Sequence, residues 1–278
     1  MKFENCKVFN MEGALRGMRN PKNSWHLSDS EFGLYDDEDA YDCIDEVAEH
    51  WAEYDGHEWG TDDYDKYFDE YGKWLEDNCF LSTHRDISDI ACIGPKDMKL
   101  AKQLIAGGSE HRKFLRQIIV SIDITAPLYW WKEFDTYKVA TVANSTSTMH
   151  KLTSKPITID CFETGDFENI PYPKDAQRPE LKSDIDEDFV QMGLIPYLEY
   201  LRQKYLELVK DNPEEAKKYW KELVRWLPNG WLQTRTWTAN YETLRSMYRQ
   251  RKDHKLTEWH QFCDFVKTLP YAKEFIID

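Results

Sequence analysis

The sequence predicts an α/β (α+β) protein, because segments with helical spacing of apolar residues alternate with segments that have strand character. Two segments have strand character: 118–124, and 231–241, which alternates and is rich in Thr and Trp. Helical segments are predicted at about 95–106, 196–209, 213–227, 244–251 and 256–268. A chain of 278 residues can bury a sizeable core, and we expect one domain over 1–278.

An acidic region lies near the amino terminus. Residues 29–77 hold 20 acids and two bases, whereas the whole chain holds 51 acids and 36 bases. Two sets of apolar and aromatic residues recur there at helical spacing: Ile44, Val47, Ala48, Trp51 and Tyr54, then Tyr64, Tyr67, Phe68, Tyr71, Trp74 and Leu75. We therefore predict an acidic helical insertion over 28–95, with carboxylates in solvent. The alternative is a DNA-mimic or partner-docking surface. Either form repels nucleic acid and anionic membranes, so direct nucleic-acid binding is not expected.

Several sequence features bear on the cellular location of the protein and on the state of its cysteines. The chain has no apolar run near the roughly 20 residues of a membrane span, and its first ten residues lack the apolar core of a secretory signal. A cytoplasmic location without membrane partners is the expectation. The six cysteines form no C-x-x-C pair, which predicts reduced thiols and no metal site. Residues 153–190, rich in Pro, Asp and Lys, predict a surface excursion.

The segment 120–152 carries the candidate chemistry. It consists of a strand, an Ala126-Pro127 stop, an aromatic helix, and a hydroxyl-rich run. The run comprises Asn144, Ser145, Thr146, Ser147 and Thr148. Its hydroxyl and amide groups can donate to a phosphate or a ribose. The alternative interpretation is a capped turn leading into a strand.

The order of these pieces resembles the flavin-dependent thymidylate synthases, with matching stretches at about 111–152, 227–237 and 238–259. The resemblance implies their fold, with a mixed or antiparallel sheet flanked by helices, and a homotetramer. It also implies FAD as cofactor, NADPH and reduced folate as cosubstrates, and a methyltransferase-type one-carbon transfer to a pyrimidine deoxynucleotide such as dUMP.

Residue roles follow from position in that pattern. Thr136, Tyr137 and Lys138 stand where the family has R-H-R and, with Asn240 and Ser246, are the implied cofactor-binding residues. The implied substrate-binding residues are Glu133, Asn144, Ser145, Ser147, Thr148, Arg225 and Arg251. Thr146, in the place of the family's serine, and His111 are the implied catalytic residues. Glu242 replaces an arginine, and threonine at 136 and 148 offers a hydroxyl where a guanidinium is expected.

These substitutions leave two functions open. One is a divergent synthase-like enzyme. The other is a catalytically lost or repurposed protein on the same scaffold, of phage or mobile-element origin, that binds a nucleotide or a protein partner. A third interpretation is a structural protein whose aromatic faces bury in an oligomer.

Overall fold

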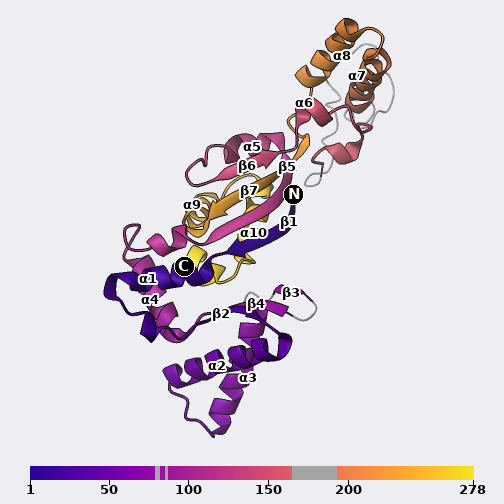
Figure 1. Cartoon of the computed structure of the whole chain (residues 1–278). Helices are drawn as coiled ribbons and strands as arrows, with labels where there is room; N and C mark the ends of the chain where they lie inside the picture. Colours follow the sequence, from indigo (N-terminus) through magenta and orange to yellow (C-terminus); the bar gives the residue numbers. More distant parts are fainter. Residues whose placement is uncertain (79–81, 85–86, 165–192) are drawn as a thin grey trace, which may run out of the picture. The chain divides into compact units, whose positions relative to one another are not determined.

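The computed structural model describes residues 1–78, 82–84, 87–164 and 193–278 (Figure 1). It confirms an α+β fold in which helices flank two sheets. The larger sheet has the order β1-β5-β7-β6, formed by β1 (Lys2–Phe9), β5 (Ile119–Pro127), β7 (Leu232–Asn240) and β6 (Val142–Ser145). The chain divides into two compact units. Unit 1 comprises 1–4, 123–138 and 143–237, and unit 2 comprises 5–122, 139–142 and 238–278.

Aromatic side chains form the core of unit 1 next to β7. Helix α5 (Leu128–Phe134) begins after Pro127 and buries Trp130, Trp131 and Phe134. The Phe134 ring packs edge-on against buried Trp237, with 4.8 Å between centroids. The indole of Trp131 donates to the carbonyl oxygen of Gln233 at 2.9 Å, which satisfies its buried N–H.

A helical hairpin forms the second half of unit 1. Helices α7 (Ile195–Leu208) and α8 (Pro213–Arg225) pack against each other, as Figure 1 shows. Helix α8 begins as the sequence predicts, with Pro213 in its first turn and the side chain of Asn212 accepting from the Glu215 backbone N–H at 3.2 Å. The hairpin shares an apolar cluster with the segment that follows α6 (Thr148–Lys151); its members include Leu152, Ile157, Leu198, Leu201 and Leu223.

In unit 2, elements from the amino-terminal and carboxy-terminal parts of the chain contact each other. Helix α1 (Met11–Arg19) contacts α4 (Pro95–Ala106), and α9 (Tyr241–Arg251) contacts both α10 (Thr257–Lys267) and a π-helical turn, η6 (Lys273–Ile277). Short 3₁₀ turns lie at η1 (Asn20–Lys22), η2 (Trp25–Leu27) and η3 (Lys113–Arg116) in this unit, and at η4 (Ile159–Cys161) in unit 1. The buried hydroxyl of Tyr271 donates to the Ala91 carbonyl at 2.9 Å and accepts from the Ile93 N–H at 2.8 Å.

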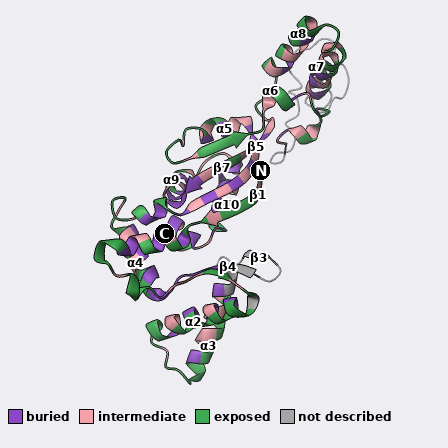
Figure 2. Ribbon diagram, in the orientation of Figure 1, coloured by how far each residue is buried: buried purple, intermediate pink, exposed green. Residues whose placement is uncertain are grey.

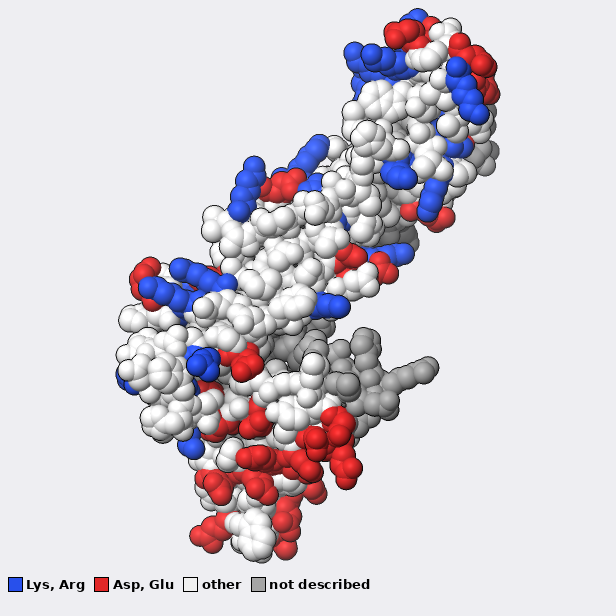
Figure 3. All heavy atoms as spheres, viewed as in Figure 1, with Lys and Arg blue, Asp and Glu red and all other residues white. Residues whose placement is uncertain are grey.

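The acidic region contains the two predicted helices, α2 (Asp37–Asp55) and α3 (Asp62–Asn78). They bury Ile44, Val47, Ala48 and Leu75 (Figure 2), and their carboxylates gather on the outside (Figure 3). The region also contains an antiparallel sheet of order β2-β4-β3, formed by β2 (Glu31–Tyr35), β4 (Ile87–Cys92) and β3 (Ser82–His84). The sequence did not predict this sheet.

Two further predictions from the sequence concern the cysteines and the segment 153–190. Cys92 is disulfide-bonded, so the prediction that all cysteines are reduced is wrong, although Cys6, Cys43, Cys161 and Cys263 are free. Residues 165–190 of the predicted surface excursion lie outside the described residues. Within the described part of the chain, no helix is long and apolar enough to cross a membrane.

Candidate functional site

The implied site residues fall in both units. Unit 1 holds Glu133, Thr136, Tyr137, Lys138, Asn144, Ser145, Thr146, Ser147, Thr148 and Arg225, and unit 2 holds His111, Asn240, Ser246 and Arg251.

The hydroxyl-rich run is anchored to β7 through its backbone. The Thr146 N–H donates to the Thr234 carbonyl at 2.9 Å, and the side-chain amide of buried Gln233 donates to the Thr146 carbonyl at 3.0 Å. Ser147 then caps α6, because its hydroxyl oxygen accepts from the His150 N–H at 3.1 Å. The side chains of Asn144, Ser145 and Thr146 are exposed. The capped turn is therefore present, but it follows strand β6 and leads into helix α6 rather than into a strand. It presents these polar side chains on a fixed backbone.

The segment that replaces R-H-R has little capacity to bind an anion. The Thr136 hydroxyl donates to the Glu133 carbonyl at 2.7 Å and so satisfies its own helix end. Tyr137 is half-buried and Lys138 is exposed. Of the three positions, only Lys138 presents a cation to solvent.

Arg235 is a residue that sequence reasoning missed. Its guanidinium lies 4.2 Å from the centroid of the Trp131 ring, donates from Nη1 to Asp135 at 2.6 Å, and donates from Nε to Gln233 at 3.0 Å. The sequence signal that could have identified it is the position of Arg235 in β7. Side chains alternate between the two faces of a strand, so Arg235 lies on the same face as buried Gln233 and Trp237. A cation on the buried face of a strand is unusual enough to indicate a polar site.

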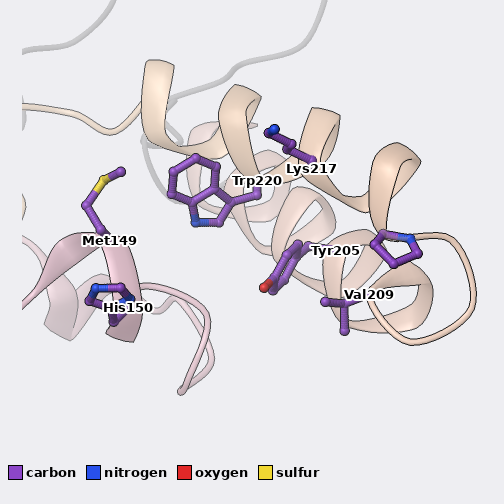
Figure 4. A pocket seen from close by; sticks show the side chains of 7 residues that line it. Met149, His150, Tyr205, Val209, Lys217 and Trp220 are labelled. Atoms are coloured by element: carbon purple, nitrogen blue, oxygen red, sulfur yellow. The ribbon is translucent and has the colours of Figure 1, made fainter.

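A pocket of about 360 Å³ lies between α6 and the helical hairpin (Figure 4). Met149 and His150 of α6 line one side, and the other side is lined by Tyr205, Val209, Pro213, Lys217 and Trp220 of the hairpin. The lining combines two large aromatic rings with an exposed amine and an imidazole, and its described residues include no carboxylate. Such a lining suits a ligand with a planar ring and a negative charge. The pocket follows the hydroxyl-rich run directly in the chain, since α6 begins at Thr148.

The two implied substrate arginines already have partners. Arg225 forms an ion pair with Glu222 one turn earlier on α8. In unit 2, the Arg251 guanidinium lies 4.5 Å from the centroid of the Trp259 ring. Each would have to leave or share its partner to bind a phosphate.

The remaining implied residues of unit 2 have structural contacts. The side chain of Asn240, 5 % exposed, caps α9 by accepting from the Thr243 N–H at 2.9 Å. The Ser246 hydroxyl accepts from Gln250 at 2.9 Å, and exposed His111 lies against Gly107. Their proposed roles toward a ligand stay predictions.

Glu242, which replaces a family arginine, is held by Arg112. The Arg112 Nε and Nη2 atoms donate to the two carboxylate oxygens at 2.8–3.1 Å. These hydrogen bonds raise the pKa of Arg112. The pair is bidentate, so both groups are neutralised locally. Among the described residues, no group of three or more His, Cys, Asp or Glu side chains is arranged to hold a metal ion.

Comparison with known proteins supports the fold. No protein-family model matches the sequence, and no curated protein matches it. The crystal structure of Thymidylate Synthase X (ThyX) from Helicobacter pylori with FAD and dUMP aligns over 100 % of this chain and 98 % of that chain, with 12 % identity and a TM-score of 0.54. Another ThyX structure from the same organism, complexed with FAD and dUMP, covers 84 % of this chain and 93 % of that chain, with 13 % identity and a TM-score of 0.43. The first likeness shows that this chain has a ThyX-like fold.

Proposed function

We propose that this chain binds a pyrimidine deoxynucleotide of the dUMP type on a ThyX-like scaffold. The observation that carries the proposal is the pocket of about 360 Å³, whose aromatic and cationic lining follows the hydroxyl-rich run. The base would stack on Trp220 or Tyr205, and the phosphate would contact Lys217 and His150. The full-length likeness to a structure that contains dUMP supports the same ligand class.

One-carbon transfer with flavin, NADPH and reduced folate is the reaction that the synthase resemblance implies. This reaction requires a flavin-binding site. The residues at the positions implied to bind flavin fit FAD poorly. The Thr136 hydroxyl donates to a carbonyl of its own helix, the Asn240 side chain caps α9, and the Glu242 carboxylate is hydrogen-bonded to Arg112. Lys138 retains an exposed cation there, but an amine lacks the planar fork of arginine. We therefore derive no reaction step through a flavin.

A second candidate function follows from this poor fit. A repurposed nucleotide-binding protein on the same scaffold requires the nucleotide pocket but not the flavin. The engagement of Thr136, Asn240 and Glu242 in other contacts favours it, because these residues stand at the implied flavin positions.

One set of measurements tests both functions. Calorimetric titration with dUMP should show saturable binding to the wild type, and Lys217→Gln should weaken it about fivefold through loss of one charge-assisted contact. Lys221→Gln, an exposed lysine on the same helix outside the pocket lining, is the matched control and should bind like the wild type. Failure of dUMP to bind, or equal effects of the two variants, would refute the proposed site.

The absorption spectrum then separates the enzyme from the binder. The purified protein is mixed with excess FAD, desalted, and scanned in the visible range. Retained flavin bands, followed by dUMP-dependent flavin reoxidation, would support the synthase reaction. A colourless protein that still binds dUMP would support the repurposed binder. The tetramer implied by the resemblance is checked on the same sample by light scattering.

A further inference from the structure

The turn between α8 and β7 in unit 1 holds the start of α5 through its backbone. The Trp231 N–H donates to the Pro228 carbonyl at 3.0 Å and closes the turn, with Asn229 and Gly230 at its two central positions. The carbonyls of Trp231 and Asn229 accept from the first two N–H groups of α5, each at 3.0 Å. These N–H groups have no acceptor within the helix, so the turn satisfies them.

The side chain of Asn229 is exposed and is bound by a lysine of α5. Lys132 Nζ donates to Asn229 Oδ1 at 2.6 Å. An ammonium group at this distance polarises the amide, because it stabilises negative charge on the oxygen. The side-chain carbonyl carbon, Cγ, is therefore activated toward a nucleophile.

The backbone nitrogen of Gly230 is the nucleophile within reach of this carbon. It belongs to the residue that follows Asn229, and its attack on Cγ closes a five-membered ring. Among the described residues, none accepts a hydrogen bond from the Gly230 N–H, so no such bond has to break first. Glycine has no Cβ to crowd the nitrogen. Asn229 is the only asparagine of the sequence that is followed by glycine.

We propose that Asn229 is a self-modification site, where the Gly230 nitrogen attacks the Asn229 side chain and Lys132 assists. The Gly230 N–H proton passes to hydroxide from the solvent, the N–Cγ bond forms, and negative charge collects on Oδ1 beside the Lys132 amine. The Cγ–Nδ2 bond then breaks, and Nδ2 takes a proton from water and leaves as ammonia. The product of this step is a cyclic imide.

Water then opens the imide at either of its two carbonyl carbons. Addition at Cγ breaks the bond between Cγ and the Gly230 nitrogen, and the residue becomes aspartate. Addition at the backbone carbonyl carbon breaks the original peptide bond instead, and the residue becomes isoaspartate. In both cases a carboxyl group replaces the carboxamide, one water is consumed and one ammonia is released.

The isoaspartate product changes the backbone that holds α5. The chain then continues through Cγ and gains one backbone atom within the turn. The oxygen that accepts from the second N–H of α5 then belongs to a carboxylate that branches off the chain. Because α5 buries Trp130, Trp131 and Phe134, the modification loosens the core of unit 1 as the protein ages. The described lining of the nucleotide pocket includes neither Asn229 nor Lys132, so this inference does not rest on dUMP binding.

The test incubates the folded wild-type protein in mildly alkaline buffer and follows two peptides by liquid chromatography and mass spectrometry. Aspartate and isoaspartate should accumulate at position 229, faster at higher pH, because hydroxide removes the Gly230 proton. The peptide with exposed Asn144 is the internal control. It should convert more slowly, because Ser145 follows Asn144 and its side chain crowds the nitrogen.

Two variants test the assigned roles. Gly230→Ala should lose measurable conversion over the same incubation, and it should fold, because a Cβ there would lie 3.8 Å from the Glu163 carbonyl oxygen, an ordinary contact. Lys132→Gln should slow conversion in the folded protein about threefold to fivefold, the effect of one exposed charged contact. In urea, where that contact is absent, Lys132→Gln and the wild type should convert at the same rate.

Three results would overturn the proposal. The first is no conversion at Asn229 in the folded protein, or a rate no higher than at Asn144. The second is undiminished conversion in Gly230→Ala, which would mean that water hydrolyses the amide directly. The third is an equal rate in the folded wild type and folded Lys132→Gln, because the amine would then give no assistance.

Discussion

Replacing Glu199 by glutamine should destabilise the protein in a pH-dependent way. Glu199, on α7, accepts from Arg202 Nε and Nη2 at 2.8 and 2.7 Å and from the Ile157 backbone N–H at 2.8 Å. Arg202 in turn donates to the Thr153 carbonyl at 3.1 Å. The pair thus ties the segment after α6 to α7, which helps to hold one side of the proposed nucleotide pocket.

The magnitude follows from the pKa of the carboxyl group. The hydrogen bonds from Arg202, then those from Ile157 and Gln203, lower the pKa of Glu199 from 4.5 to about 2. At about 1.4 kcal/mol per pH unit this difference gives an upper bound of roughly 3.5 kcal/mol. The carboxylate is 20 % exposed, and water screens the pair, so we expect a loss of about 2 kcal/mol in the free energy of unfolding.

The ion pair stabilises the protein at neutral pH and not in acid, because the pKa of Glu199 is lower in the folded state than in the unfolded state. The stabilisation is complete above about pH 5 and is lost as the pH falls from about 4.5 to 2. Urea unfolding of the wild type and Glu199→Gln at pH 7, 4.5 and 3 should therefore show a difference that shrinks with acidification. Glu207→Gln, which breaks an exposed pair with Lys204 on the same helix, is the control and should cost less than about 0.5 kcal/mol. A difference that is independent of pH, or equal losses in both variants, would refute the reasoning.

Four other substitutions test contacts within each of the two units. Tyr271→Phe should cost about 2–3 kcal/mol by urea unfolding, because the Ala91 carbonyl and the Ile93 N–H both lose a buried partner; a loss below about 0.5 kcal/mol would contradict this. Glu242→Gln and Arg112→Gln should each destabilise unit 2 by about 1–2 kcal/mol, and the double variant should lose clearly less than the sum, which a double-mutant cycle measures. Additive losses would show that the bidentate pair contributes nothing. Trp131→Phe should cost about 1–2 kcal/mol, because the Gln233 carbonyl loses its donor and Arg235 loses the indole ring; thermal unfolding that matches the wild type would oppose this.

The elements with local start and stop signals were predictable. Helix α4 occupies 95–106 as expected, because Pro95 favours its first turn and Gly107 follows its end. The strands β1 and β2 were missed. Residues 2–9 are mostly exposed, and the pairing of β2 with β4 joins residues more than 50 positions apart, which no local pattern reveals. At the site, the alternation of β7 was recognised as a strand, but the meaning of a cation on its buried face depends on Trp131 and Asp135, which lie about 100 positions away.

The charges at the site determine how a nucleotide can be held. Where the synthase pattern has guanidinium groups, this chain has threonine at 136 and 148, and Glu242 is neutralised by Arg112. Arg235 and Arg225 are paired with carboxylates. Apart from these paired arginines, the exposed lysines in the implied site and the proposed pocket of unit 1 are Lys138 and Lys217, which are point charges without a fixed fork. A phosphate bound by exposed ammonium groups is screened by salt over a Debye length of about 10 Å at 0.1 M. The affinity for dUMP should therefore fall as ionic strength rises, whereas stacking on Trp220 should persist. A dUMP affinity that is unchanged between low and high salt would mean that the phosphate is held by buried groups other than these lysines.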